Sequence, residues 1–210
     1  MKNIGYLYFP GLNNEECNNV MPRLHERLMQ RYWKSADMEL EYVPIGWLSS
    51  YDEIISIATK KVESMANQFD GVALIGASAG ASLALNVFTE MSDKNIALIA
   101  MHGRLSEGNY LQSDRRSLES AANLGSSYPA HSFYDSVRLA ELKIANLTDD
   151  EKHRMLILKQ LTDRVVPLEL MDIVGIKSHR SIAFGHIGGF VAHAFADRDI
   201  IRHFAEKTLL

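Results

Sequence analysis

The chain has 210 residues, of which 47% are hydrophobic and 23% charged, and this balance predicts one globular domain with a sizeable core. The formal net charge is -4 and neither sign is gathered into long runs, which argues against a nucleic-acid partner because phosphate binding needs a concentrated basic face. Cys17 is the only cysteine, so an internal disulfide and a paired-cysteine zinc or redox motif are excluded.

The first residues predict a strand. The apolar run from Ile4 to Phe9 is ended by Pro10-Gly11 before it reaches the length of a signal-peptide core, so we expect no secretion signal. A lone cysteine fits a reducing, cytoplasmic setting. Residues 14–30 then have apolar positions at helical spacing, and residues 41–44 give a weaker strand prediction.

The next part of the chain contains a long stretch without charge that resembles a membrane helix. An amphipathic helix is predicted over 51–69, and it is followed by an apolar segment at 71–75 and an Ala-, Leu- and Val-rich segment at 79–91. Gly76 and Gly80 bracket a polar residue at the point where a strand would turn into a helix. We therefore predict a buried strand followed by a buried helix, and no membrane span.

The middle of the chain differs in composition from the rest. Residues 95–101 predict another fully apolar strand, but residues 102–150 are rich in Ser, Asn, Gly and charges and contain one plausible helix, at 132–145. An insertion of this length is usually functional or covers a site, so we expect a lid or a pocket-forming insertion at about 103–150 within a single domain spanning 1–210. Its apolar residues could line an acyl pocket or cover the core: Leu105, Tyr110, Leu111, Tyr128, Phe133 and Tyr134.

The last third of the chain returns to alternation of strands and helices. We predict a strand at 153–158, a short helix at 167–174, a strand at 179–184 and a closing helix at 189–207. Strands that are apolar on both faces, each followed by a helix, indicate an α/β fold. The expected architecture is a mostly parallel sheet of about six strands with helices on both faces, a three-layer sandwich.

The strongest local motif is Gly76-Ala77-Ser78-Ala79-Gly80, between the predicted strand at 71–75 and the helix at 79–91. A nucleophilic serine on such a sharp turn has a strained backbone, and the residues two positions away must be very small for strand and helix to pass closely. The turn points the Ser78 hydroxyl out of the sheet, towards the free amides of the helix N-terminus. A phosphate-cradling glycine turn, or close packing alone, is the alternative interpretation.

Two further motifs come after later strands. They are Thr162-Asp163-Arg164-Val165-Val166-Pro167 and Gly185-His186. Together with the serine motif and the order of elements, they make nearly the whole chain resemble the α/β-hydrolase superfamily, in particular its small serine esterases and thioesterases. That superfamily places its catalytic residues in the chain order Ser, acid, His. The resemblance therefore implies that Ser78 is the nucleophile, Asp163 the acid and His186 the base.

The resemblance also implies an oxyanion hole. The superfamily usually has a His-Gly pair after the first strand, and the residue after that glycine lends an amide to the hole. Here Pro10-Gly11-Leu12 stands in that place, so we expect the backbone amides of Leu12 and Ala79 to form the hole, with Pro10 a departure from the pattern. Gln160-Leu161-Thr162, in place of the glycine often found ahead of the acid, is a second departure.

Other titratable residues compete for the same roles. They are His102, His179 and His193 for the base, and Glu107, Asp150 and Asp172 for the acid. His102 and Glu107 are the serious rivals because both follow a strand that ends at the expected active edge. Asp150 precedes its strand and would emerge at the opposite edge, and Asp172 lies in a predicted helix. Arg104 is expected to be exposed to solvent, with contact to a substrate carboxylate or phosphate as the alternative.

These residues predict a serine hydrolase that cleaves a carboxylic ester or thioester of a small molecule through an acyl-enzyme intermediate. No metal and no cofactor are expected. Hydrolysis of an amide or peptide and transfer of the acyl group to another acceptor would use the same residues. A binding module without turnover on the same fold is the alternative from a different class. The natural substrate and the oligomeric state stay open.

Overall fold

The computed structural model describes residues 3–12, 27, 29–47, 49–106, 131–181 and 184–210. Its centre is a six-stranded sheet in the order β2-β1-β3-β4-β5-β6, in which every neighbouring pair is parallel. The strands are β1 (Ile4–Phe9), β2 (Glu39–Tyr42), β3 (Gly71–Ala77), β4 (Ile96–Met101), β5 (Met155–Lys159) and β6 (Lys177–Arg180). The predicted parallel sheet of about six strands is therefore confirmed.

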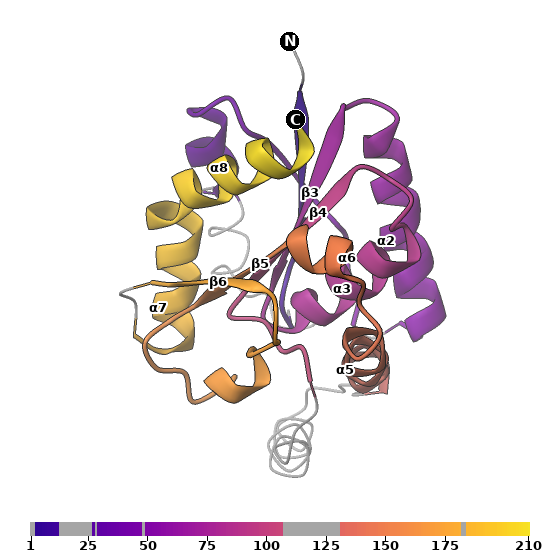
Figure 1. Ribbon diagram of the computed structural model, residues 1–210, viewed down its shortest axis with the longest axis vertical. Coiled ribbons are helices and arrows are strands. Elements are labelled where there is room, and N and C mark those ends of the chain that lie inside the picture. The colour runs from indigo at the N-terminus through magenta and orange to yellow at the C-terminus, as the bar shows by residue number, and fades with distance from the viewer. Residues whose placement is uncertain (1–2, 13–26, 28, 48, 107–130, 182–183) are drawn as a thin grey trace.

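Helices cover both faces of the sheet, as the sequence predicts (Figure 1). One core cluster joins α2 (Tyr51–Ala66), α3 (Ala79–Glu90) and α5 (His131–Ile144) to one face of the sheet. The other cluster joins α8 (Arg198–Leu209) and the helical residues 29–34 to the opposite face. The result is the expected three-layer arrangement. The predicted helix at 14–30 lies mostly outside the described residues.

The two edge strands lie a few residues earlier than the sequence predicts. Strand β2 is Glu39–Tyr42 where 41–44 was expected, and β6 is Lys177–Arg180 where 179–184 was expected. Strand β6 is polar and mostly exposed, and charged side chains on an edge strand hinder its pairing with another chain. Residues 182–183 of the predicted strand lie outside the described residues.

The register brings the carboxyl ends of the central strands to one level. Phe9 at the end of β1 is paired with Gly76 of β3, and Met101 at the end of β4 is paired with Ala77. Residues that follow these strands therefore meet at a single edge of the sheet, as expected for a parallel α/β sheet. In the fold, this is the edge where chemistry can be assembled.

Helix α5 is tied to α3 by buried polar contacts. The Ser136 hydroxyl lies 2.8 Å from the Ser82 hydroxyl, and the Asn86 side-chain amide donates to the Ser136 carbonyl at 2.9 Å. The predicted helix at 132–145 is thus present and docked on the helix that follows the serine motif. Tyr110, Leu111 and Tyr128 lie outside the described part of the chain, whereas Phe133 belongs to the core, with 6% of its surface exposed.

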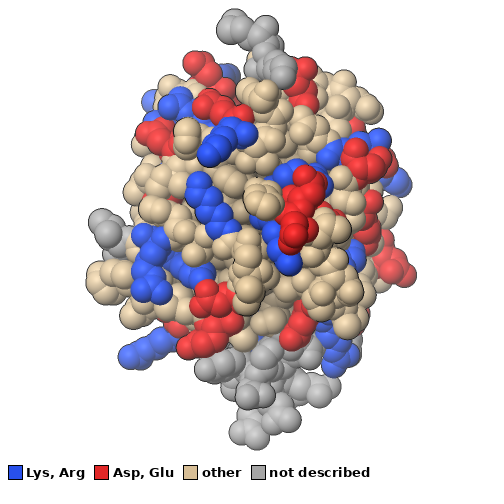
Figure 2. Space-filling view, in the orientation of Figure 1, with Lys and Arg blue, Asp and Glu red and all other residues tan. Residues whose placement is uncertain are grey.

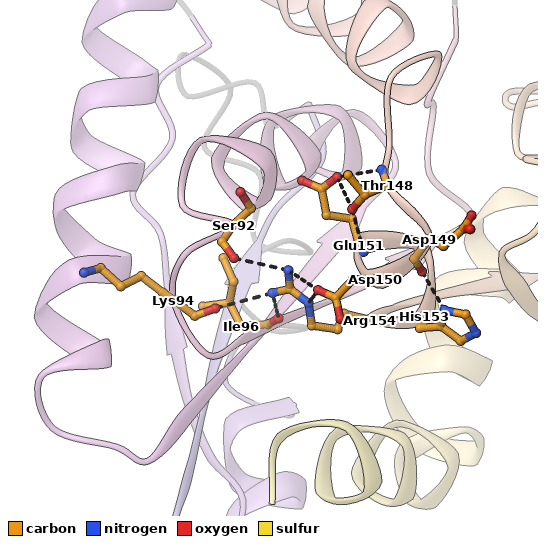
Figure 3. A network of polar contacts seen from close by, with 9 residues as sticks. All are labelled: Ser92, Lys94, Ile96, Thr148, Asp149, Asp150, Glu151, His153 and Arg154. Carbon is orange, nitrogen blue, oxygen red and sulfur yellow. Dashed lines mark hydrogen bonds and ion pairs between the residues drawn. The ribbon is translucent and has the colours of Figure 1, made fainter.

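The opposite, amino-terminal edge of the sheet is stabilised by Arg154 (Figure 3). Its guanidinium donates to the carbonyls of Ser92, Lys94 and Ile96 and pairs with Asp150 at 2.9 Å. Asp150 belongs to α6 (Asp149–His153), which begins with a capping box at Thr148. Asp150 therefore lies at the edge away from the serine motif, as the sequence indicates.

The C-terminal part of the chain differs from the predicted single helix. It forms α7 (Gly185–Val191), the π-helical turn η3 (Ala192–Ala196) and α8 in succession. The helix expected at 167–174 is only the 3-10 turn η2 (Leu168–Leu170) after Pro167. Apolar periodicity does not distinguish a continuous helix from one interrupted by a π turn, since a single wider turn changes the average spacing of apolar residues very little.

The surface view shows Lys and Arg interspersed with Asp and Glu over the face that is drawn (Figure 2). No helix within the described ranges combines the length and the apolar character needed to cross a bilayer.

Candidate active site

Ser78 sits at the turn between β3 and α3 with φ 52° and ψ -122°. Such positive φ values are costly for a residue with a side chain and persist only where the surroundings enforce them. The Ser78 amide donates to the Met101 carbonyl at 3.1 Å, and the Ser78 carbonyl accepts from the amides of Ala81 and Arg104, each at 3.1 Å. Strand β4 and helix α3 therefore hold the strained turn from both sides.

Two glycines make this turn sterically possible. A Cβ placed on Gly80 would lie 2.1 Å from the carbonyl oxygen of Phe9, and one on Gly76 would lie 2.4 Å from the Cα of Ala81. Backbone atoms cannot move aside as a flexible side chain can, so these contacts require glycine at both positions. The small residues of the motif thus have the steric cause that the sequence suggested.

The side chains of the three residues singled out in the sequence meet at this edge. The Nε2 atom of His186 lies 3.0 Å from the Oγ of Ser78, and the Nδ1 atom of His186 lies 2.8 Å from the Oδ2 of Asp163. An ionised carboxylate only accepts hydrogen bonds, so Nδ1 carries the proton and Nε2 presents its lone pair to the serine hydroxyl. A general base for Ser78 needs this tautomer.

Asp163 is held as an ionised carboxylate. Its side chain has no exposed surface, and it accepts hydrogen bonds from the Val165 amide at 2.7 Å, the Val166 amide at 3.0 Å and the side-chain amide of Gln160. Burial acts to raise the pKa of the Asp163 carboxyl, but the hydrogen bond from His186, the Val166 and Val165 amides and the charge of His186 outweigh it. The pKa is therefore lowered from its ordinary value.

The loops that carry the acid and the histidine are joined to each other. Thr162 forms an isolated parallel bridge with Phe184, and the Gly185 amide donates to the Thr162 carbonyl at 2.7 Å. Gly185 has φ 71°, a conformation that favours glycine, and it places His186 in the first turn of α7. This junction fixes the separation of the His186 ring from Asp163.

The backbone around Ser78 contains the two amides that the sequence assigns to an oxyanion hole. Ala79 is the first residue of α3, where helix amides have no partner within the helix and the helix dipole is positive. Leu12 follows Gly11, and a Cβ placed on Gly11 would lie 3.1 Å from the Cβ of Ser78. The backbone that carries the Leu12 amide therefore passes beside Ser78. The role of both amides stays a prediction.

His102 and His193, two of the rival histidines, lie behind His186. His102 is fully buried, and its ring meets the His186 ring edge to face with 4.9 Å between centroids. The His193 ring stacks on His102 at 5.4 Å, and its Nδ1 atom lies 2.6 Å from the Asp197 carboxylate. The π-helical turn η3 carries His193 into this position. His186 thus makes the contact to Ser78, and the His102 ring packs against the His186 ring.

The remaining rivals occupy other sites. Asp172 follows the turn η2 and pairs with Lys159, and His179 is partly exposed in β6 with its Nε2 3.8 Å from Asp197. Glu107 lies outside the described residues. Among the residues that are described, no group of three or more His, Cys, Asp and Glu side chains could hold a metal ion.

The expectation that Arg104 faces solvent is wrong. Only 3% of its surface is exposed. A Cβ on Gly103 would lie 2.2 Å from the Cβ of Ala81, so the chain runs tightly against α3 directly before Arg104. The amide of Arg104 is one of the groups that hold the Ser78 carbonyl.

Sequence reasoning missed two residues next to this site. In the sequence, Gln160 is only a departure from the superfamily pattern, yet its side chain donates to Asp163. No sequence pattern singles out Trp47, yet its indole N–H donates to the Gly11 carbonyl at 3.1 Å. A polar residue placed directly after an apolar strand is a signal for Gln160. Trp47 has no comparable signal, because its contact joins residues 36 positions apart.

Comparison with known proteins identifies structures that share the fold of this chain. No protein-family model matches the chain, and no curated protein does. Solved structures do match. An esterase from Exiguobacterium antarcticum is 16% identical, with a TM-score of 0.58 over 98% of this chain and 92% of that one. Carboxyl esterase 2 from the fungus Tuber melanosporum is 11% identical, with a TM-score of 0.62 over 99% and 78%.

A pyrethroid hydrolase gives a third match across the chain. It is 12% identical, with a TM-score of 0.61 over 98% of both chains. These structural neighbours are esterases and hydrolases with the α/β-hydrolase fold, so this chain has that fold. Identities this low show the fold and leave the activity to be argued from the residues of the site.

Proposed function

We propose that this protein is a serine hydrolase that cleaves a carboxylic ester or thioester of a small molecule. One observation carries the proposal: Ser78, His186 and Asp163 form a continuous hydrogen-bonded chain at the carboxyl edge of the sheet, with Ser78 in a strained turn at the N-terminus of α3. An activated nucleophile requires a base within hydrogen-bond reach and a third group that orients the base. His186 meets the first condition and Asp163 meets the second.

In the proposed mechanism, His186 takes the proton of the Ser78 hydroxyl through Nε2 while Oγ attacks the acyl carbonyl carbon. The new C–O bond converts the carbonyl oxygen into an oxyanion, which the amides of Leu12 and Ala79 stabilise. Collapse of the tetrahedral intermediate expels the alcohol or thiol, which receives its proton from His186. Water then attacks the acyl-enzyme, again with His186 as base, and releases the carboxylic acid and Ser78.

Asp163 has two roles in this cycle. Its hydrogen bond holds His186 in the tautomer that can accept the serine proton, and its charge stabilises the imidazolium that forms. The lowered pKa of Asp163 keeps the carboxylate ionised at neutral pH, as both roles require. The amides of Val165 and Val166 hold its other oxygen, Oδ1, so that Oδ2 stays directed at His186.

The proposed ester or thioester substrate differs from an amide in how easily its leaving group is expelled. Esters and thioesters need less assistance to expel their leaving group than amides do, and nothing in the described site is dedicated to protonating an amine other than His186 itself. Amide hydrolysis and acyl transfer to another acceptor would use the same residues. A binding module without turnover would have no need for the strained Ser78 turn or for the orientation of His186.

The rest of the predicted organisation belongs to the same proposal. We expect a single domain in which residues of the 103–150 insertion shape the acyl pocket, and the lone Cys17 favours a reducing, cytoplasmic location. Mixed surface charge on the face that Figure 2 shows supports a small-molecule substrate over nucleic acid.

Hydrolysis of nitrophenyl esters of graded acyl length, with a matched series of thioesters, tests the proposal. We expect turnover of at least one member by the purified protein and none above background by Ser78→Ala. Ser64→Ala, at an exposed serine of α2, is the control and should keep full activity. A folded wild-type protein that hydrolyses no member of either series would contradict the esterase reading and favour the amide or binding alternatives.

A further inference from the structure

Trp47 ties the Gly11–Leu12 backbone, which carries one of the two predicted oxyanion-hole amides, to the hydrophobic core. Its indole Nε1 donates to the carbonyl oxygen of Gly11 at 3.1 Å in a buried hydrogen bond. Gly11 in turn lies beside the nucleophile, because a Cβ there would be 3.1 Å from the Cβ of Ser78 and 3.6 Å from its Oγ. The Gly11–Leu12 peptide unit is therefore held by Trp47 within reach of the reacting serine.

A peptide unit is planar, and in the trans form its C=O and N–H point in opposite directions. The described backbone has no cis peptide bonds. Fixing the direction of the Gly11 carbonyl consequently fixes the direction of the Leu12 N–H. The hydrogen bond turns the carbonyl towards Trp47 and leaves the N–H on the opposite side of the peptide plane. A rotation of this unit by half a turn would exchange the two groups.

This orientation matters because the two groups have opposite effects on an oxyanion. The Leu12 N–H would stabilise the developing negative charge, whereas the Gly11 carbonyl oxygen in its place would repel it. A Cβ at position 11 would make a tight contact with Ser78, and glycine there also permits backbone conformations that other residues exclude. A peptide unit next to glycine therefore needs an external contact to keep one orientation.

Trp47 is suited to provide this contact because it is itself held rigidly. It is 2% exposed, and its carbonyl accepts a hydrogen bond from the Ser132 hydroxyl at 2.8 Å. Its ring meets the Phe133 ring edge to face, with 6.0 Å between centroids. Ser132 and Phe133 belong to the first turn of α5, which is docked on α3 through Ser136.

We infer that Trp47 is a positioning residue for the oxyanion hole, whose indole N–H locks the Gly11–Leu12 peptide in the orientation that presents the Leu12 amide to the substrate. The inference rests on the proposed hydrolase function and adds to it a residue that acts only through the backbone. Trp47 touches no reacting atom. Its contribution is therefore confined to the transition state, where the oxyanion exists, and leaves ground-state binding of the ester nearly unchanged.

The test is Trp47→Phe, which keeps an aromatic ring and removes the N–H donor. We expect kcat to fall about tenfold to a hundredfold, less than or comparable to the loss of a complete oxyanion donor, with KM within about twofold. Trp33→Phe is the matched control: the only other tryptophan in the chain is also fully buried, but it packs edge to face on Tyr6 in the other core cluster. Trp33→Phe should lower the melting temperature similarly and leave kcat unchanged.

A second variant separates the hydrogen bond from packing. Benzothienylalanine incorporated at position 47 keeps the size and shape of tryptophan and replaces the N–H by sulfur, so it should reproduce the fall in kcat even if Trp47→Phe folds poorly. If wild-type protein is active and the benzothienylalanine variant keeps kcat within twofold, Trp47 only fills space and the inference is wrong. If wild-type protein shows no hydrolysis at all, the proposed function fails and the inference fails with it.

Discussion

The turn that carries Ser78 and the loops that carry Asp163 and His186 are stabilised by different kinds of contact. The Ser78 turn is surrounded by buried backbone, and its glycines leave no space for a single methyl group. The acid and histidine loops instead include exposed apolar residues, Val165 at 56% and Phe184 at 69%, and are held by hydrogen bonds to Asp163 and Thr162. Tight steric fit, together with backbone hydrogen bonds, therefore positions the nucleophile, whereas hydrogen bonds and charge position the base.

The most direct test of this difference adds one methyl group near Ser78 and one in α7, the helix that carries His186. Gly80→Ala places a Cβ 2.1 Å from the Phe9 carbonyl oxygen and should destabilise the protein by about 3 kcal/mol or more, with loss of active enzyme. Gly188→Ala in α7 meets no described atom within 4 Å and should be neutral or stabilising by up to about 1 kcal/mol, because alanine favours a helix. Chemical denaturation of both variants measures the contrast.

If Gly80→Ala folds with wild-type stability, the close approach of α3 to β1 does not constrain the Ser78 turn. If Gly188→Ala is as damaging as Gly80→Ala, the histidine loop is also fixed by steric fit and the contrast between the regions disappears.

In the loops that carry Asp163 and His186, removing a charge without changing side-chain volume should lower turnover. Asp163→Asn keeps the size of the side chain but removes the charge that orients His186, so turnover should fall by about a hundredfold to ten-thousandfold with KM nearly unchanged. Asp172→Asn is the control, because that carboxylate pairs with Lys159 and not with His186. It should keep full turnover. A large loss in Glu107→Gln with little effect of Asp163→Asn would move the acid to the earlier strand.

The same carboxylate gives stability a defined pH dependence. The pKa of Asp163 is lower in the folded state than its ordinary value, so its contribution is fully present above the unfolded pKa of about 3.9 and is lost as pH falls through the folded pKa. The difference in unfolding free energy between wild type and Asp163→Asn should therefore shrink as the pH falls below about 5. Denaturation series at several pH values test this. A difference that grows with acid would reverse the sign and rule out the ionised carboxylate.

The smallest expected effect concerns His102, whose ring packs against His186. His102→Phe keeps an aromatic ring against His186 but cannot act as a base, so turnover should stay within about tenfold of wild type, whereas His186→Phe should lose at least about a thousandfold. Equal losses in the two variants would make His102 a direct participant in proton transfer.

Much of this arrangement was predictable because short-range steric rules determine it. Gly76, Ser78 and Gly80 identify a tight strand-to-helix turn in any parallel sheet, and the apolar segments around them fix the order of the central strands. Edge strand β6 was misplaced since pairing with β5, and not hydrophobicity, defines it. The contact of Gln160 with Asp163 is local and has a sequence signal, a polar residue directly after an apolar strand. The contact of Trp47 with Gly11 is not predictable, because it depends on how segments 36 residues apart meet at the edge of the sheet.

The π-helical turn η3 is a further feature that the sequence did not reveal. It shifts the face of the chain between α7 and α8 and brings His193 onto His102. Residue periodicity averages over such a local change, so the closing segment resembles one helix from sequence alone.

Reaction with a fluorophosphonate probe tests the central claim most directly, because this probe modifies a serine only when a neighbouring base activates it. Intact-mass analysis of wild-type protein should show a single adduct, peptide mapping should place it on Ser78, and Ser78→Ala should show none. His186→Phe should label far more slowly than wild type. Correctly folded wild-type protein that forms no adduct after long exposure would contradict the assignment of Ser78 as an activated nucleophile and the hydrolase function with it.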